Sequence, residues 1–214
     1  MHEQQTGSWV VMKFGGTSVS STECWRTIRE QAASGLEAGH RLLIVVSALS
    51  GVTDLLTRVA DGVGDDERKW IRSELDSRHR ALYAAHGLEP SAEFSRHWDR
   101  LNHLIGSAGE PPDPARRVQL LAHGELLSSA IGAQVLAAAG LDVRWQDARE
   151  LLSVAPESEG ELLAARCDDE ADPGLARQLA SEGDLHITQG FIAGGPSGST
   201  HLLGRGGSDT SAVA

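Results

Sequence analysis

The chain has 214 residues, of which 30 are acidic and 19 are Lys or Arg, and its formal net charge is −11. This length is enough for one large domain or two small ones, and the acidic excess argues against a nucleic-acid-binding surface. The first residues lack the basic and apolar regions of a signal peptide, and two cysteines form no disulfide framework. The longest apolar runs fall far short of the roughly 18 residues that a membrane span needs. We therefore expect a cytoplasmic chain without a membrane span.

The opening segment predicts a strand, a helix and a second strand. Residues 9–14 form a short apolar run, residues 22–38 carry apolar side chains at helical spacing, and residues 41–47 form a continuous apolar run. Such a continuous run is typical of a strand that is covered on both faces. The order strand, helix, strand is typical of a right-handed unit in a parallel sheet, and it predicts an α/β fold.

The remainder of the chain predicts more helix than strand. A helical hairpin is expected as an insertion at about 62–115, and a proline-rich break at 110–114 separates it from a long apolar helix. Residues 153–172 are acidic and show no clear period. The expected helices are 65–87, 90–107, 114–139 and 173–181, and the expected strands are 142–146 and 185–191.

The first candidate site follows the first strand. Lys13 stands at the strand end, and Gly15, Gly16, Thr17 and Ser18 come after it. This is not a Walker A loop, because there the Lys follows the glycines. Two glycines let the backbone approach a phosphate closely, the hydroxyls and amides bind its oxygens, and the Lys supplies a point charge. A plain turn with a solvated Lys is the alternative.

The second candidate site follows the second strand, and a short helix is expected from Leu55 onward. Ligands in open α/β sheets bind at the carboxyl ends of the strands. The loops after two neighbouring strands lie on one edge, so Ser47 and Thr53 are candidates for polar contact with a ligand. Helix capping by Thr53 or Ser50 explains the same residues equally well.

The third candidate is Glu125, which stands among Leu, Ala and Ile in the long helix. A carboxylate in such surroundings is unexpected unless it is paired or at the surface. If it faces a pocket, it suits the ammonium group of a substrate. A solvent-facing Glu on an amphipathic helix is the alternative, and the neighbouring His123 is interpreted as structural.

The fourth candidate is the segment 204–209, in which three glycines surround Arg205. Such a segment predicts a backbone folded tightly around a small anion, which Arg205 can bind through two hydrogen bonds. Ser208 and Asp209 are expected to cap a following helix. An Arg in a flexible glycine loop is the alternative. No spacing of Cys and His indicates a metal site.

Four segments in one order resemble aspartate kinase. They read VMKFGGTSV, VVSALSGVTDLL, HGELLSSAIGAQVLAAAGLDVRWQDA and QGFIAGGPSGSTHLLGRGGSDTSA, and they span residues 10–54 and 119–214. The region 62–115 is similar only in general character. The first and last segments are also similar to kinases that are fused to a diaminopimelate decarboxylase.

The resemblance implies a three-layer α/β/α amino-acid-kinase fold with a mainly parallel sheet. It implies transfer of a phosphoryl group from ATP to the side-chain carboxylate of L-aspartate, which gives 4-phospho-L-aspartate, the entry step to lysine, threonine and methionine. Lys13 and Asp209 would be catalytic, with Asp209 orienting Lys13 or the substrate amine. The phosphates of ATP would meet Lys13, Gly15, Gly16, Thr17, Ser18 and Ser47, and aspartate would meet Thr53, Glu125, Phe191, Arg205, Gly206, Ser208 and Asp209.

Family members continue well beyond the 204–209 segment, so residues 1–214 are interpreted as the substrate-binding portion of the domain, with the nucleotide-binding half missing. We therefore expect this chain alone to have little kinase activity. Mg²⁺ would arrive with ATP rather than on protein ligands, and a homodimer is left open. Two alternatives remain: a glutamate or acetylglutamate kinase of the same fold, and a truncated non-catalytic module.

Overall fold

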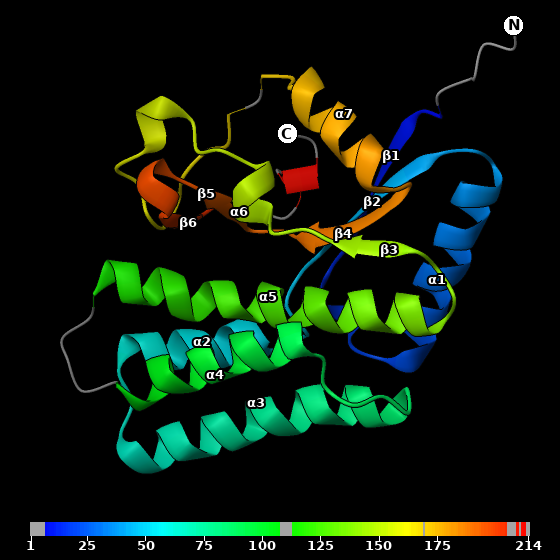
Figure 1. Cartoon of the computed structure of the whole chain (residues 1–214). Helices are drawn as coiled ribbons and strands as arrows, with labels where there is room; N and C mark the ends of the chain where they lie inside the picture. Colours follow the sequence, from blue (N-terminus) through cyan, green and yellow to red (C-terminus); the bar gives the residue numbers. More distant parts are fainter. Residues whose placement is uncertain (1–6, 108–112, 169, 205–208, 210, 213–214) are drawn as a thin grey trace, which may run out of the picture.

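The computed structural model describes residues 7–107, 113–168, 170–204, 209 and 211–212. Within these residues, four parallel strands form the main sheet in the order β1-β2-β4-β3 (Figure 1). The predicted parallel pairing of the first two strands is confirmed. The strands are β1 (Trp9–Phe14), β2 (Arg41–Val46), β4 (Leu185–Gln189) and β3 (Val143–Trp145).

Helices cover both faces of this sheet, which gives three layers and confirms the predicted fold class. Helices α1 and α5 pack on one face, and α7 lies on the other (Figure 1). Helices α2, α3 and α4 form a further layer against α5, away from the sheet. The helices are α1 (Thr22–Glu37), α2 (Val52–Asp61), α3 (Asp65–Ala85), α4 (Ala92–Gly106), α5 (Pro114–Ala138), α6 (Ala148–Leu151) and α7 (Pro173–Glu182).

Side chains cap several of the helix starts. The side chains of Ser21 and Ser91 accept hydrogen bonds from backbone amides at the starts of α1 and α4. Asp113 does the same for α5, whose first residue is proline. Helix α2 begins at Val52, three residues earlier than predicted, and it follows Gly51, whose φ of 75° is a left-handed conformation that favours glycine.

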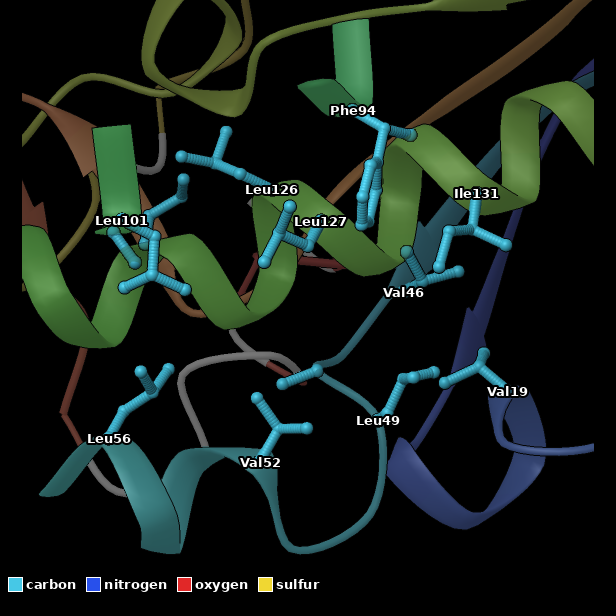
Figure 2. Close-up of a cluster of buried hydrophobic side chains, with 14 of the residues drawn as sticks. Val19, Val46, Leu49, Val52, Leu56, Phe94, Leu101, Leu126, Leu127 and Ile131 are labelled. Carbon is cyan, nitrogen blue, oxygen red and sulfur yellow. The ribbon is translucent and has the colours of Figure 1, made fainter. Parts of the chain in front are cut away.

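Helix α5 is the centre of the hydrophobic core. By length and composition it is apolar enough to cross a membrane, but 83% of its most apolar window is buried inside the protein, as in a core helix. Figure 2 shows Leu126, Leu127 and Ile131 of α5 among core side chains from β2, α2 and α4. A Cβ atom at Gly132 would overlap the ring of Trp25 on α1, so only glycine lets these two helices meet.

A small second unit, absent from the sequence prediction, lies beside the main sheet. Strands β5 (Ile192–Gly194) and β6 (Thr200–Leu202) pair antiparallel and are joined by a 3-10 turn at Pro196–Gly198. The segment 152–168 packs on them through isolated bridges and a 3-10 turn at Pro156–Ser158. The unit has its own apolar cluster, formed by Val154, Ala165, Cys167, Ala193 and Leu203.

Candidate active site

Three strands of the main sheet end at the same level. Phe14 pairs with Val46, and Val46 pairs with Gln189, so the segments that follow β1, β2 and β4 leave the sheet along one edge. The first two segments touch, because a Cβ atom at Gly16 would lie only 2.7 Å from the carbonyl oxygen of Ala48. Gly16 belongs to a 3-10 turn, η1 (Gly16–Val19).

A cavity of about 520 Å³ opens at this edge and brings together most of the predicted site. Its walls come from β1, η1, the loop after β2, α2, α5 and the small unit. The predicted residues that line it are Lys13, Gly16, Ser47, Thr53, Glu125, Phe191 and Asp209.

Lys13 and Asp209 form an ion pair in this cavity. Lys13 Nζ lies 2.6 Å from Asp209 Oδ1, although 195 residues separate the two along the chain. The Lys13 side chain is 31% exposed and that of Asp209 is 73% exposed, so solvent screens the pair and ligands can reach it. The sequence predicts that Asp209 orients Lys13 or the substrate amine, and this ion pair is the contact that the first of these two roles requires.

Glu125 is buried, with only 3% of the residue exposed, and it still lines the cavity. Its Oε1 atom accepts a hydrogen bond from the backbone N–H of Ala48 at 3.2 Å. Its Oε2 atom has no partner among the described residues. Burial raises the pKa of the Glu125 carboxyl to about 8, and the Ala48 hydrogen bond opposes this only in part. The solvent-facing alternative for Glu125 is therefore wrong.

Phe191 follows β4 and holds a strained conformation. Its φ of 69° is rare for a residue with a side chain. Its N–H donates to the Ser211 hydroxyl at 3.1 Å, and its carbonyl accepts from the N–H of Leu203 at 2.8 Å. These bonds hold Leu203 and Ser211, which stand before and after Asp209 in the sequence, at the end of β4.

The remaining predicted residues divide into two groups. Gly15, Thr17 and Ser18 lie in or before η1 but do not line the cavity, and the Gly15 carbonyl accepts from the Ser18 N–H at 2.9 Å. The other group, Arg205, Gly206 and Ser208, lies outside the described residues.

Sequence reasoning missed part of one wall of the cavity. Leu163 and Ala164 come from the segment that could not be assigned, and Leu203 follows β6, next to Gly204 of the fourth candidate segment. Leu163 is an exposed large apolar side chain at this wall. Nothing in the local sequence marks Leu163, Ala164 or Leu203, because their position depends on the small unit docking beside the sheet.

The described part of the chain contains no group of three His, Cys, Asp or Glu side chains that could hold a metal ion. Lys13, a buried carboxyl and the backbone amides near Gly16 are the chemistry at hand. Together they suit a ligand that has both an ammonium group and anionic groups.

The chain is similar to known proteins over nearly its whole length. The model of the amino acid kinase family matches residues 8–214. The chain belongs to the amino acid kinase family. Among curated relatives, this family member is 33% identical over 212 residues to the lysine-sensitive aspartokinase 3 of Escherichia coli, an alignment covering 95% of this chain and 45% of that protein. It is 30% identical over 217 residues to the aspartokinase of Chlamydia trachomatis, covering 99% of this chain and 46% of that protein.

A solved structure is similar in fold. The crystal structure of E. coli aspartokinase III in complex with aspartate and ADP matches with a TM-score of 0.79 and 29% sequence identity. The match covers 95% of this chain and 44% of that one. This amino acid kinase chain thus spans less than half the length of the aspartokinases it resembles.

Proposed function

We propose that this chain is the substrate-binding portion of an aspartate kinase, which transfers the γ-phosphoryl group of ATP to the side-chain carboxylate of L-aspartate. The product would be 4-phospho-L-aspartate, the first intermediate toward lysine, threonine and methionine. One observation carries the proposal. The buried carboxyl of Glu125 has one oxygen without a hydrogen-bond partner among the described residues. It shares a cavity with an accessible cation, Lys13, at the carboxyl edge of a parallel sheet.

Glu125 is the proposed partner of the substrate ammonium group. Its Oε2 atom needs a hydrogen-bond donor, and its ionised form needs a positive charge, because the site is desolvated. The α-ammonium of an amino acid supplies both. Thr53 lines the same cavity beside it, and Arg205 is proposed to bind the α-carboxylate.

Lys13 is the proposed contact of the transferring phosphoryl group. The substrate carboxylate is already ionised at neutral pH, so the reaction requires no general base. It requires that two anionic reactants approach in line, and Lys13 with the Gly16 backbone offsets their repulsion. Asp209 holds the ammonium group of Lys13 in the cavity until a ligand arrives.

The nucleotide would bring its own metal ion. The described residues offer no metal cluster, so Mg²⁺ is proposed to reach the site on the ATP phosphates, where it shields negative charge. Gly15, Thr17, Ser18 and Ser47 are proposed to contact those phosphates. The rest of the nucleotide site is proposed to lie in the portion of the relatives that this chain does not span.

Other properties remain proposals of the same kind. We propose that the protein is cytoplasmic and that this chain forms one substrate-binding domain with a helical insertion at about 62–115. Formation of a homodimer and fusion to a diaminopimelate decarboxylase are two further proposals.

Calorimetric titration of the purified chain with L-aspartate tests the function. We expect weak but saturable binding of L-aspartate, no binding of succinate, which lacks the ammonium group, and little ADP release in a coupled assay with ATP. Binding of L-glutamate or N-acetyl-L-glutamate without binding of L-aspartate would overturn the assignment. ADP release at the rate of a full-length aspartate kinase would overturn the proposal that the chain lacks part of the nucleotide site.

A further inference from the structure

The loop after β2 is held through both backbone groups of one residue, Ser50. The N–H of Ser50 donates to the Ser20 hydroxyl at 2.9 Å, and the same hydroxyl donates to the Gly16 carbonyl at 2.6 Å. The carbonyl of Ser50 accepts from Arg78 Nη1 at 2.9 Å. Ser20 therefore joins the two loops at the carboxyl edge of the sheet, and Arg78 binds the loop after β2 through the Ser50 carbonyl.

Arg78 reaches this loop from α3, which belongs to the helical layer and not to the sheet. Its Nε atom donates to Glu74 Oε1 one turn earlier at 2.8 Å, which orients the guanidinium group along the helix. One nitrogen is then free to face the loop. A guanidinium group suits this task, because its donors point in fixed and different directions.

Gly51 leaves the space that Arg78 needs. A Cβ atom at Gly51 would lie 2.9 Å from Arg78 Nη1, and the φ of Gly51 is 75°. Glycine is thus favoured twice, by its backbone conformation and by the guanidinium group above it. Ser50 and Gly51 therefore lie against Arg78, although Arg78 is far from them in the sequence.

The loop that Arg78 holds makes up one wall of the cavity. Ala48, Ser50 and Thr53 all line it, and the N–H of Ala48 is the group that binds Glu125. A shift of this loop would move the Ala48 amide away from Glu125 and Thr53 away from the ligand. Neither Arg78 nor Glu74 lines the cavity itself.

We propose that Arg78, oriented by Glu74, is a positioning residue for the substrate cavity, and that through it helix α3 controls the order of segment 47–53, which comprises the loop after β2 and the first two residues of α2. The effect on ligand binding rests on the function proposed above, whereas the effect on loop order does not. A simple surface ion pair between Arg78 and Glu74 is the competing explanation, and it predicts no effect on the loop.

Arg80 provides a matched control. It stands on the same helix and pairs with Asp76 one turn earlier, with Nε to Oδ1 at 2.8 Å, in the same arrangement as Arg78 and Glu74. The two pairs differ in that Arg78 also binds the Ser50 carbonyl. R78A, R78K, E74Q and R80A therefore separate the loop contact from the helical ion pair.

Backbone amide hydrogen exchange is measured first, on the ligand-free chain. We expect segment 47–53 to exchange at least about tenfold faster in R78A, with a smaller change in R78K and E74Q, and at the wild-type rate in R80A. Segment 41–46 in β2 is expected to keep its protection in every variant. Equal exchange of segment 47–53 in R78A and R80A would overturn the proposal. If R78A does not fold, equal exchange in R78K, E74Q and wild type would overturn it equally.

Titration with L-aspartate follows. We expect the Kd to rise about five- to tenfold in R78A, to recover partly in R78K and to stay unchanged in R80A. An unchanged Kd in R78A with a loosened loop would contradict the link between loop order and the substrate site. If wild type binds no L-aspartate while the exchange difference persists, the proposed function fails and the positioning of the loop by Arg78 stands.

Discussion

Glu125 Oε1 lies 3.2 Å from the backbone nitrogen of Ala48, and this hydrogen bond joins the core helix α5 to the loop after β2. One oxygen of a buried carboxyl is thus used to organise the site, and the other is left for a ligand. The carboxyl has a structural role and a proposed binding role in the same cavity. These roles are separable, because they depend differently on its charge.

Binding of L-aspartate should depend on pH through Glu125. Its pKa is about 8 in the ligand-free protein, so below pH 8 the carboxyl must lose a proton before it can pair with an ammonium group. We expect the Kd to fall about tenfold for each pH unit between pH 6 and 8 and then to level off. Calorimetric titrations across this range measure the effect.

The E125Q variant should bind L-aspartate more weakly and show a flat pH profile. E89Q, which changes an exposed carboxylate, should keep the wild-type profile. A wild-type Kd that is constant from pH 6 to 8 would show that Glu125 does not bind the ammonium group in its ionised form.

Lys13 should govern the affinity for phosphates. Inorganic tripolyphosphate, which carries the charges of the ATP phosphate chain, should bind K13M about tenfold more weakly than wild type, a loss of about 1.4 kcal/mol. Added salt should weaken the wild-type interaction and narrow this difference, because Lys13 is partly exposed. K69M removes an exposed lysine on α3 and serves as the control. Equal affinities of K13M and K69M would exclude Lys13 as a phosphate ligand.

The contact between Gly132 and Trp25 should make alanine costly in α5. A Cβ atom at Gly132 would overlap the Trp25 ring and lie 2.7 Å from Ile187 Cδ1. We expect G132A to lower the free energy of unfolding by about 1–3 kcal/mol, although alanine favours helix. Urea unfolding measures the change. G106A, at the end of α4 where nothing lies within 4 Å, should be neutral or slightly stabilising, and equal midpoints for the two variants would contradict the overlap.

Acid should destabilise the protein in part through His79. This residue is fully buried, and burial lowers its pKa to about 4, below the value of 6.5 in the unfolded chain. The unfolded chain binds the extra proton between these values, so stability from this group is complete above pH 6.5 and is lost as pH falls toward 4. The expected loss is about 3 kcal/mol.

Urea unfolding of H79L at pH 7 and pH 5 tests this contribution. Glu125 titrates in an overlapping range with the opposite sign, since its raised pKa favours the folded protein at lower pH. The comparison of wild type with H79L removes that term. We expect H79L to lose less stability on acidification than wild type, whereas H103Q, at an exposed histidine of α4, should follow wild type. Parallel losses in wild type and H79L would refute the assignment.

Local patterns were sufficient for the frame of this fold. Apolar runs and helical spacing gave β1, β2, β4 and the long helices, because each of these elements buries a face that its own sequence displays. The glycines after β1 and the polar loop after β2 predicted which edge of the sheet holds the site, because ligands in open α/β sheets bind at the carboxyl ends of the strands. The register of β1, β2 and β4 then confirmed that these loops leave the sheet together.

The parts that escaped prediction depend on contacts between distant segments. Strands β5 and β6 have three residues each and lie among Gly, Pro and Ser, so their sequence has no strand period. The burial of Glu125 is set by the packing of α5 against the loop after β2, which its helix sequence does not encode. The contact from Arg78 to Ser50 spans 28 residues and leaves no local mark.

The indole of Trp25 has a consequence for how this cavity can be altered. Its Nε1–H donates to the Val19 carbonyl at the end of η1 at 2.9 Å, while its ring rests on Gly132 of α5. One buried side chain therefore sets the spacing between the turn beside Lys13 and the helix that carries Glu125. Substitutions at Trp25 would resize the pocket from inside the core while every ligand-facing side chain keeps its identity, so a mutational search limited to the cavity walls would overlook a main determinant of its width.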